Sequence, residues 1–129
     1  MAARAARARP LRDRLHVVVL AGGAGERFWP SSRRARPKPF LQVVDGRSLL
    51  EATLVRARAI TATERIWIVC GGEHAAALRR HAGIPASRVI VEPERRNTAM
   101  ASGVAAARIA ALDPDAVLLM LAADHRVPN

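Results

Sequence analysis

The sequence predicts an α/β fold in which helices cover both faces of a mainly parallel, doubly wound sheet. Short runs of aliphatic and β-branched residues recur along the chain, as strands buried on both faces require. Segments that are amphipathic at helical spacing, or rich in alanine, separate these runs. Because strands that alternate with helices pair in parallel through right-handed crossovers, the order strand, helix, strand indicates a parallel sheet.

The predicted strands are apolar segments that end at turn residues. They span 15–21 (LHVVVLA), 66–70 (IWIVC), 88–91 (RVIV) and 116–122 (AVLLMLA). Glycines follow the first two, a Glu-Pro pair follows the third, and Asp124-His125 stands just past the fourth. A further short apolar segment, 40–44, is closed by Asp45-Gly46, a pair that favours a turn.

The first predicted helix begins at Ser48, because Ser48-x-x-Glu51 is a capping box that satisfies two backbone N–H groups. Its predicted apolar face consists of Leu49, Leu50, Ala52, Leu54, Val55, Ala59 and Ile60. Arg56 and Arg58 are predicted to lie on the solvent side of this helix.

Two more helices are predicted, over 73–81 with Gly83 as its stop, and from Thr98 to Asp113-Pro114. His74 and His81 fall on the first of these, which we expect to be a surface helix. Neither histidine has an acid or a second histidine at ligand spacing, so neither is predicted to be functional.

These elements predict a Rossmann-like sheet of order third, second, first, fourth strand. In such a sheet the first and fourth strands are neighbours at the topological switch point, where ligands bind beyond the carboxyl ends of the strands. The order therefore brings the loop that begins at Gly22 close to Asp124. Residues 1–14 precede the first strand and are predicted to be a disordered basic extension, with order beginning near Leu15.

Composition restricts the function classes. The formal net charge is +10, from 21 Lys and Arg against 11 Asp and Glu, but the basic residues concentrate in residues 1–14 and in the loop after the first strand. Since aromatic residues are only 3% of the chain, a nucleic-acid partner is not predicted. No apolar run approaches a membrane span, so no membrane association is predicted. A single cysteine, Cys70, excludes an internal disulfide, which favours a reducing compartment such as the cytoplasm. Because Cys70 ends an apolar run, we expect a small buried side chain rather than a nucleophile.

The loop after the first strand has the composition of a phosphate-binding site. Gly22, Gly23 and Gly25 allow backbone amides to approach an anion closely. Five cations without an intervening acid follow: Arg27, Arg33, Arg34, Arg36 and Lys38. The spacing excludes a Walker A loop and a dinucleotide-binding fingerprint.

The segment LAGGAGERFWPSSRRARPKPF, residues 20–40, resembles the signature of the sugar-phosphate nucleotidyltransferases, Leu-Ala-Gly-Gly-x-Gly-x-Arg followed by Trp-Pro and Pro-Lys. Its continuation from Phe28 to Arg33 most resembles the mannose-1-phosphate guanylyltransferase (GDP-mannose pyrophosphorylase) branch. The resemblance implies that 15–129 is the N-terminal, nucleotide-binding part of a nucleotidyltransferase domain.

The resemblance also implies the site residues. The nucleotide-binding set is Ala21, Gly22, Gly23, Gly25, Arg27, Lys38, Asn97 and Thr98, of which Arg27 and Lys38 would also be catalytic. Asp124 would hold Mg²⁺, and His125 would orient that corner. Asn97 and Thr98 would contact the base, although a helix N-cap explains the same pair. Met100 and Pro39 depart from the branch, which usually has proline and glutamine there.

The implied reaction joins GTP and mannose 1-phosphate into GDP-mannose and releases pyrophosphate. In the family, the sugar-contacting residues and a second metal-binding aspartate lie beyond the position of Asn129, so we expect this portion alone to bind GTP–Mg²⁺ weakly and to turn over little. Two alternatives stay open: a nucleotide-binding regulatory module, and a sugar-1-phosphate nucleotidyltransferase specific for UTP, dTTP or ATP. A homo-oligomer is also left open.

Overall fold

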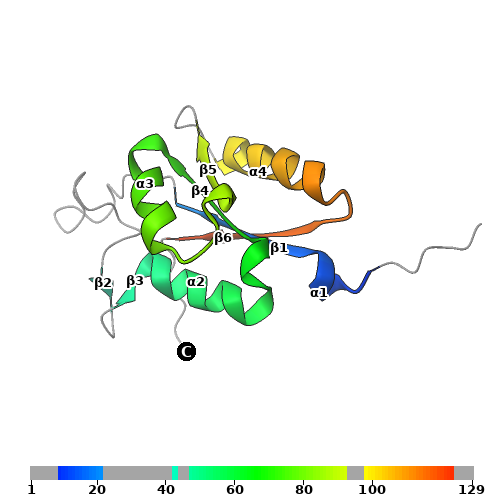
Figure 1. The fold of residues 1–129 in the computed structure, drawn as a ribbon, viewed down its shortest axis with the longest axis horizontal. Coiled ribbons are helices and arrows are strands. Elements are labelled where there is room, and N and C mark those ends of the chain that lie inside the picture. The colour runs from blue at the N-terminus through cyan, green and yellow to red at the C-terminus, as the bar shows by residue number, and fades with distance from the viewer. Residues whose placement is uncertain (1–8, 22–41, 44–46, 93–97, 124–129) are drawn as a thin grey trace, which may run out of the picture.

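The computed structural model describes residues 9–21, 42–43, 47–92 and 98–123. Within them, a four-stranded sheet runs through the middle of the molecule (Figure 1). Its strands are β1 (Leu15–Leu20), β4 (Ile66–Gly71), β5 (Val89–Glu92) and β6 (Val117–Ala122). Their order is β5-β4-β1-β6 and every neighbouring pair is parallel, so the predicted order is confirmed.

Helices cover both faces of this sheet. Helices α2 (Leu49–Ile60) and α3 (Gly72–His81) lie on one side and α4 (Thr98–Leu112) lies on the other (Figure 1). Short 3₁₀ turns, η4 (Thr63–Arg65) and η5 (Ala86–Arg88), lead into β4 and β5. Two further short strands, β2 (Gln42–Val43) and β3 (Arg47–Ser48), pair in an antiparallel ladder just before α2.

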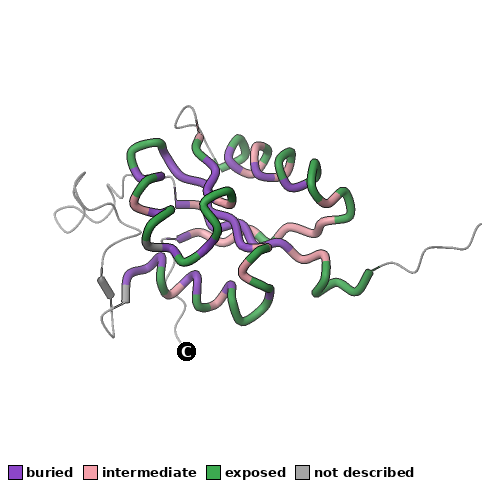
Figure 2. Tube along the Cα trace, in the orientation of Figure 1, coloured by how far each residue is buried: buried purple, intermediate pink, exposed green. Residues whose placement is uncertain are grey.

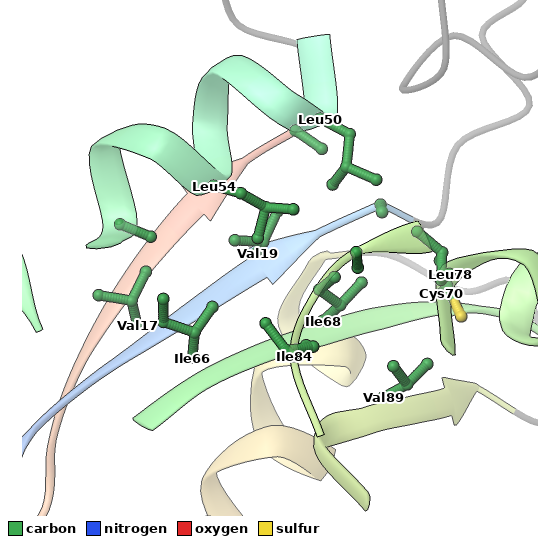
Figure 3. Packing of buried hydrophobic residues seen from close by; sticks show 14 of the residues in the cluster. Val17, Val19, Leu50, Leu54, Ile66, Ile68, Cys70, Leu78, Ile84 and Val89 are labelled. Atoms are coloured by element: carbon green, nitrogen blue, oxygen red, sulfur yellow. The ribbon is translucent and has the colours of Figure 1, made fainter. Parts of the chain in front are cut away.

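The apolar residues of β1 and β4 face two separate cores because successive side chains of a strand point to opposite faces. Beneath α2 and α3, the core contains Val17, Val19, Leu50, Leu54, Ile66, Ile68, Cys70 and Leu78, among others (Figure 3). Beneath α4, it contains Val18, Trp67, Val69, Ile90, Ala101, Ala105 and Ile109. Figure 2 shows that burial follows the central strands and the inner sides of the helices. Burial on both faces explains why these strands are almost continuously apolar.

The capping box at α2 is confirmed, but the predicted apolar face of this helix is partly wrong. The Ser48 hydroxyl accepts from the Glu51 N–H at 3.1 Å, and Glu51 Oε2 accepts from the Ser48 N–H at 2.7 Å. Val55 and Ile60 are 46% and 44% exposed, whereas Thr53 and Ala57 are buried. Thr53 can be buried because its hydroxyl donates to the Leu49 carbonyl at 2.9 Å.

Helix α3 ends where the sequence predicts, but one of its histidines lies differently. Gly83 has φ +65°, a left-handed conformation suited to glycine after a helix. His74 is buried rather than on the surface, and burial lowers the pKa of its imidazole. The side chain of His81 lies outside what the structure describes.

The N-terminal segment is ordered earlier than Leu15, where the sequence predicts that order begins. A helical turn, α1 (Leu11–Arg14), precedes β1 directly. Arg9, before this turn, forms an ion pair with Asp113, which follows α4. This contact could not be predicted, because its partners are 104 residues apart in the chain. Residues 1–8 of the predicted extension lie outside the described residues.

Candidate functional site

The carboxyl ends of β1 and β6 lie side by side. Leu20 pairs with Ala122, and the Ala123 N–H donates to the Leu20 carbonyl at 3.0 Å. On the other side of β1, the Ala21 N–H donates to the Val69 carbonyl at 2.8 Å. Ala21 and Ala123 are both buried and each extends its ladder by one residue beyond the strand.

This edge is the topological switch point of the sheet. From β1 the chain crosses through α2 to β4 on one side, and from β5 it crosses through α4 to β6 on the other side of β1. Diverging connections leave room for a ligand beyond the ends of the central strands. The predicted phosphate loop begins one residue after Ala21, and the predicted metal ligand is the residue after Ala123. The described residues that lead into both segments are therefore neighbours at the switch point.

Two of the predicted nucleotide-binding residues are described. Ala21 ends the β1 ladder, and Thr98 is the first residue of α4, where it is exposed. The remaining predicted residues, Gly22, Gly23, Gly25, Arg27, Lys38, Asn97 and Asp124, lie outside the described residues. Thr98 follows β5, whose carboxyl end is in register with the end of β4. All the predicted segments therefore continue from the same edge of the sheet.

This edge also contains Gly71 and Glu92, which the sequence does not predict to be site residues. Gly71 pairs with Glu92 at the ends of β4 and β5, and burial raises the pKa of the Glu92 carboxyl. The sequence contains a signal for both residues, because Gly71-Gly72 ends one predicted strand and Glu92-Pro93 ends the strand predicted to lie beside it.

Cys70 is fully buried one residue before this edge, as predicted. Burial, with a smaller contribution from the Glu92 carboxylate, raises the pKa of its thiol to about 11, against the attraction of Arg79. The thiol is therefore protonated at neutral pH and is a poor nucleophile.

Comparison with known proteins identifies the family. The sequence profile described as nucleotidyl transferase matches residues 16–128. This chain belongs to the nucleotidyl transferase family. The match begins at the second residue of β1 and runs past the end of β6. The family region therefore contains the four-stranded sheet except Leu15, and it contains all the predicted site residues of this nucleotidyl transferase chain.

This nucleotidyl transferase chain is similar to bacterial proteins of known name. It is 40% identical over 111 residues to the xanthan biosynthesis protein XanB of Xanthomonas campestris pv. campestris, covering 84% of this chain and 24% of that protein. It is 37% identical over 115 residues to mannose-1-phosphate guanylyltransferase of Escherichia coli, covering 87% of this chain and 24% of that protein. The chain thus spans about a quarter of the length of these relatives.

A solved structure has the same fold. It is the crystal structure of a protein named mannose-1-phosphate geranyltransferase, from Thermus thermophilus. The TM-score is 0.77 at 41% sequence identity, and the match covers 90% of this nucleotidyl transferase chain and 34% of that chain.

The described part of this nucleotidyl transferase chain has no group of three or more His, Cys, Asp and Glu side chains able to hold a metal ion. Asp124, the predicted metal ligand, lies outside that part. No helix in the described ranges is both long and apolar enough to cross a membrane.

Proposed function

We propose that this nucleotidyl transferase chain is the GTP-binding portion of a mannose-1-phosphate guanylyltransferase. The observation that carries the proposal is the pairing of β1 with β6, in which Ala123 donates to Leu20. This pairing makes the residues directly before Gly22 and Asp124 neighbours at the switch point. The glycine loop, its cations and the relatives named mannose-1-phosphate guanylyltransferase support the same reading.

In the proposed reaction, a phosphate oxygen of mannose 1-phosphate attacks the α-phosphorus of GTP, and pyrophosphate leaves. The attacking phosphate is already ionised, so no general base is required. What the reaction requires is the close approach of two anions in line, together with neutralisation of the charge that builds up on the pyrophosphate.

The chain's own residues meet these requirements by charge and by backbone donors. The amides of Gly22, Gly23 and Gly25 would bind the triphosphate, while Arg27 and Lys38 would offset its negative charge. Thr98, the first residue of α4, would contact the base together with Asn97, which precedes it in the sequence. Asp124 would hold Mg²⁺, which supplies further neutralisation of the phosphate oxygens when bound.

Nucleotide binding by the 129-residue chain tests the proposal. We expect GTP to bind in the presence of Mg²⁺, and Lys38→Ala to weaken binding by about tenfold or more, the usual effect of losing a charged hydrogen-bond donor. Arg80→Ala, which removes an exposed cation from α3, is the matched control and should leave the affinity unchanged. Isothermal titration calorimetry measures both.

The metal and the base are tested in the same assay. Asp124→Asn should abolish the gain in affinity that Mg²⁺ gives, while leaving metal-free binding nearly unchanged. GTP should bind more tightly than ATP, UTP or dTTP. A chain that binds all four nucleotides equally, or that binds GTP as well after Lys38→Ala, would contradict the proposal.

The buried, protonated Cys70 supports a reducing compartment, which we propose to be the cytoplasm.

We expect the 129-residue chain alone to form little or no GDP-mannose. Steady formation of GDP-mannose from GTP and mannose 1-phosphate, followed by chromatography, would prove that expectation wrong.

A further inference from the structure

A buried polar cluster lies at the opposite edge of the sheet, where the strands begin. His16 is the second residue of β1 and Trp67 the second residue of β4, and both are buried. The Trp67 Nε1–H donates to His16 Nδ1 at 3.0 Å, and His16 Nε2 lies 3.3 Å from Asp113 Oδ2. A six-residue strand is about 20 Å long, so this cluster is well separated from the switch point.

The two contacts determine which nitrogen of His16 carries the proton. An indole N–H can only donate, so Nδ1 must accept and has no hydrogen. The proton of the neutral imidazole is then on Nε2, from which it donates to the Asp113 carboxylate. A second proton would go to Nδ1, where it would face the Trp67 N–H as donor against donor. Trp67 is fully buried, so its N–H would lose its acceptor at a place where water does not replace it.

Charged groups from several elements surround the imidazole. Asp113, after α4, favours its protonated form; Arg65 from η4 and Arg88 from η5 oppose that form. Burial is the largest effect, and together with these two arginines it lowers the pKa of His16 despite Asp113.

Asp113 is itself held in its ionised form. Arg9 pairs with it from the N-terminal segment, and the backbone N–H of Asp115 donates to its Oδ1 at 3.3 Å. Burial raises the pKa of Asp113, but the hydrogen bonds from Arg9 and His16 outweigh burial and keep this pKa below its usual value. Among the groups of this cluster, His16 is therefore the one that takes up a proton when the pH falls below neutral.

We propose that His16, Trp67 and Asp113 form a proton-sensitive latch that holds the turn between α4 and β6, and through Arg9 the N-terminal segment, against β1 and β4. With neutral His16 the latch is closed, because each of its nitrogens has a partner. Protonation of Nδ1 breaks the bond to Trp67 and opens the latch. Since the folded state disfavours the imidazolium, the latch stabilises the fold above the ordinary histidine pKa of about 6.5, and that stability is lost as the pH falls below it.

Nuclear magnetic resonance tests the latch directly. In a Trp29→Phe background Trp67 is the only tryptophan, so its indole N–H signal is unambiguous. We expect one histidine, absent from the spectrum of His16→Gln, to be the Nε2–H tautomer and to titrate below the ordinary pKa of about 6.5. The indole signal should shift with the same midpoint. A histidine with the proton on Nδ1, or one that titrates at its ordinary value without affecting the indole, would overturn the proposal.

Three variants separate the latch from other titrations. His16→Gln supplies one acceptor and one donor without a titrating proton, so the Trp67 signal should become independent of pH. His74→Gln changes the buried histidine of α3 and should leave the Trp67 transition in place. Asp113→Asn removes the charge that favours the imidazolium and should move the midpoint to lower pH. A Trp67 transition that survives His16→Gln, disappears in His74→Gln or moves to higher pH in Asp113→Asn rules the latch out.

Discussion

Gly83 and Gly103 differ in backbone conformation, and only Gly83 has a positive φ. Gly83 has φ +65° after α3, and a Cβ there would lie 3.0 Å from Arg58 Nη2, which donates to the Ala82 carbonyl at 2.7 Å. Gly103 lies within α4, and a Cβ there would have no neighbour within 4 Å. Glycine is therefore required at Gly83 and only costs conformational entropy at Gly103.

Alanine at the two positions should have opposite effects. Gly83→Ala should lower the free energy of unfolding by about 1–2 kcal/mol, since a left-handed conformation is unfavourable for any residue with a Cβ. Gly103→Ala should raise it by about 0.5–1 kcal/mol. Urea denaturation followed by circular dichroism measures both, and a shift in the same direction for the two variants would contradict this account.

Residue environments were predictable where the local sequence alone decides them. Cys70 was predicted to be buried because it ends an apolar strand, and Gly83 was predicted to stop α3. Thr53 and His74 were not predicted to be buried, since a polar side chain within an amphipathic helix normally faces solvent. Their burial depends on how each helix is rotated against the sheet.

Helix α2 depends on its N-terminal cap because the capping box satisfies two backbone N–H groups that have no partner within the helix. Ser48→Ala removes the acceptor for the Glu51 N–H and should lower the free energy of unfolding by about 0.5–2 kcal/mol. Ser87→Ala, in the exposed turn η5, is the control and should change stability little. Equal losses for the two serines would show that the cap is unimportant.

Helix α4 packs on the sheet mainly through small residues, so its one large buried side chain should matter most. Its buried residues are Ala101, Ala105 and Ile109. Ile109→Ala should lower the free energy of unfolding by about 2–5 kcal/mol, because it removes fully buried methyl groups and leaves a cavity. Leu112, in the last turn of the same helix, is 63% exposed, so Leu112→Ala should cost no more than about 0.5 kcal/mol. Thermal denaturation compares the two variants, and a similar loss in both would contradict this packing.

In the molecule as a whole, β6 is the edge strand of the sheet that is most open to pairing with another chain. It pairs with β1, and no described strand pairs with its outer edge. Its residues, VLLMLA, carry no charge, and none of them is fully buried. An uncharged apolar edge with free backbone donors and acceptors favours pairing with a second chain.

We expect the chain to self-associate as its concentration rises. Leu119→Lys places a charge on β6 at a side chain that is 37% exposed, and it should shift the population toward monomer. Val55→Lys, at a helical position that is 46% exposed, is the control and should not have this effect. Light scattering coupled to size-exclusion chromatography measures both, and equal monomer fractions in the parent chain and in Leu119→Lys would argue against edge pairing.

The four strands of the sheet, the three long helices and the strand order follow from the amino-acid sequence alone, whereas α1, the β2–β3 ladder and the 3₁₀ turns do not. Continuous apolar runs of this length, bounded by turn residues, favour strands buried on both faces. Alternation with helices indicates a parallel sheet, and the doubly wound strand order then places the first strand next to the fourth. The same rules, together with the glycine loop, predict that ligands bind at the switch point.

Which side chains meet is decided by the tertiary packing. His16 and Asp113 are 97 residues apart and His16 and Trp67 are 51 apart, yet they share a hydrogen-bonded cluster. No local pattern encodes such contacts, because they arise from the register between strands and the path of the turn after α4. For the same reason, the buried face of α2 depends on its docking against the sheet, whereas its cap is a local property.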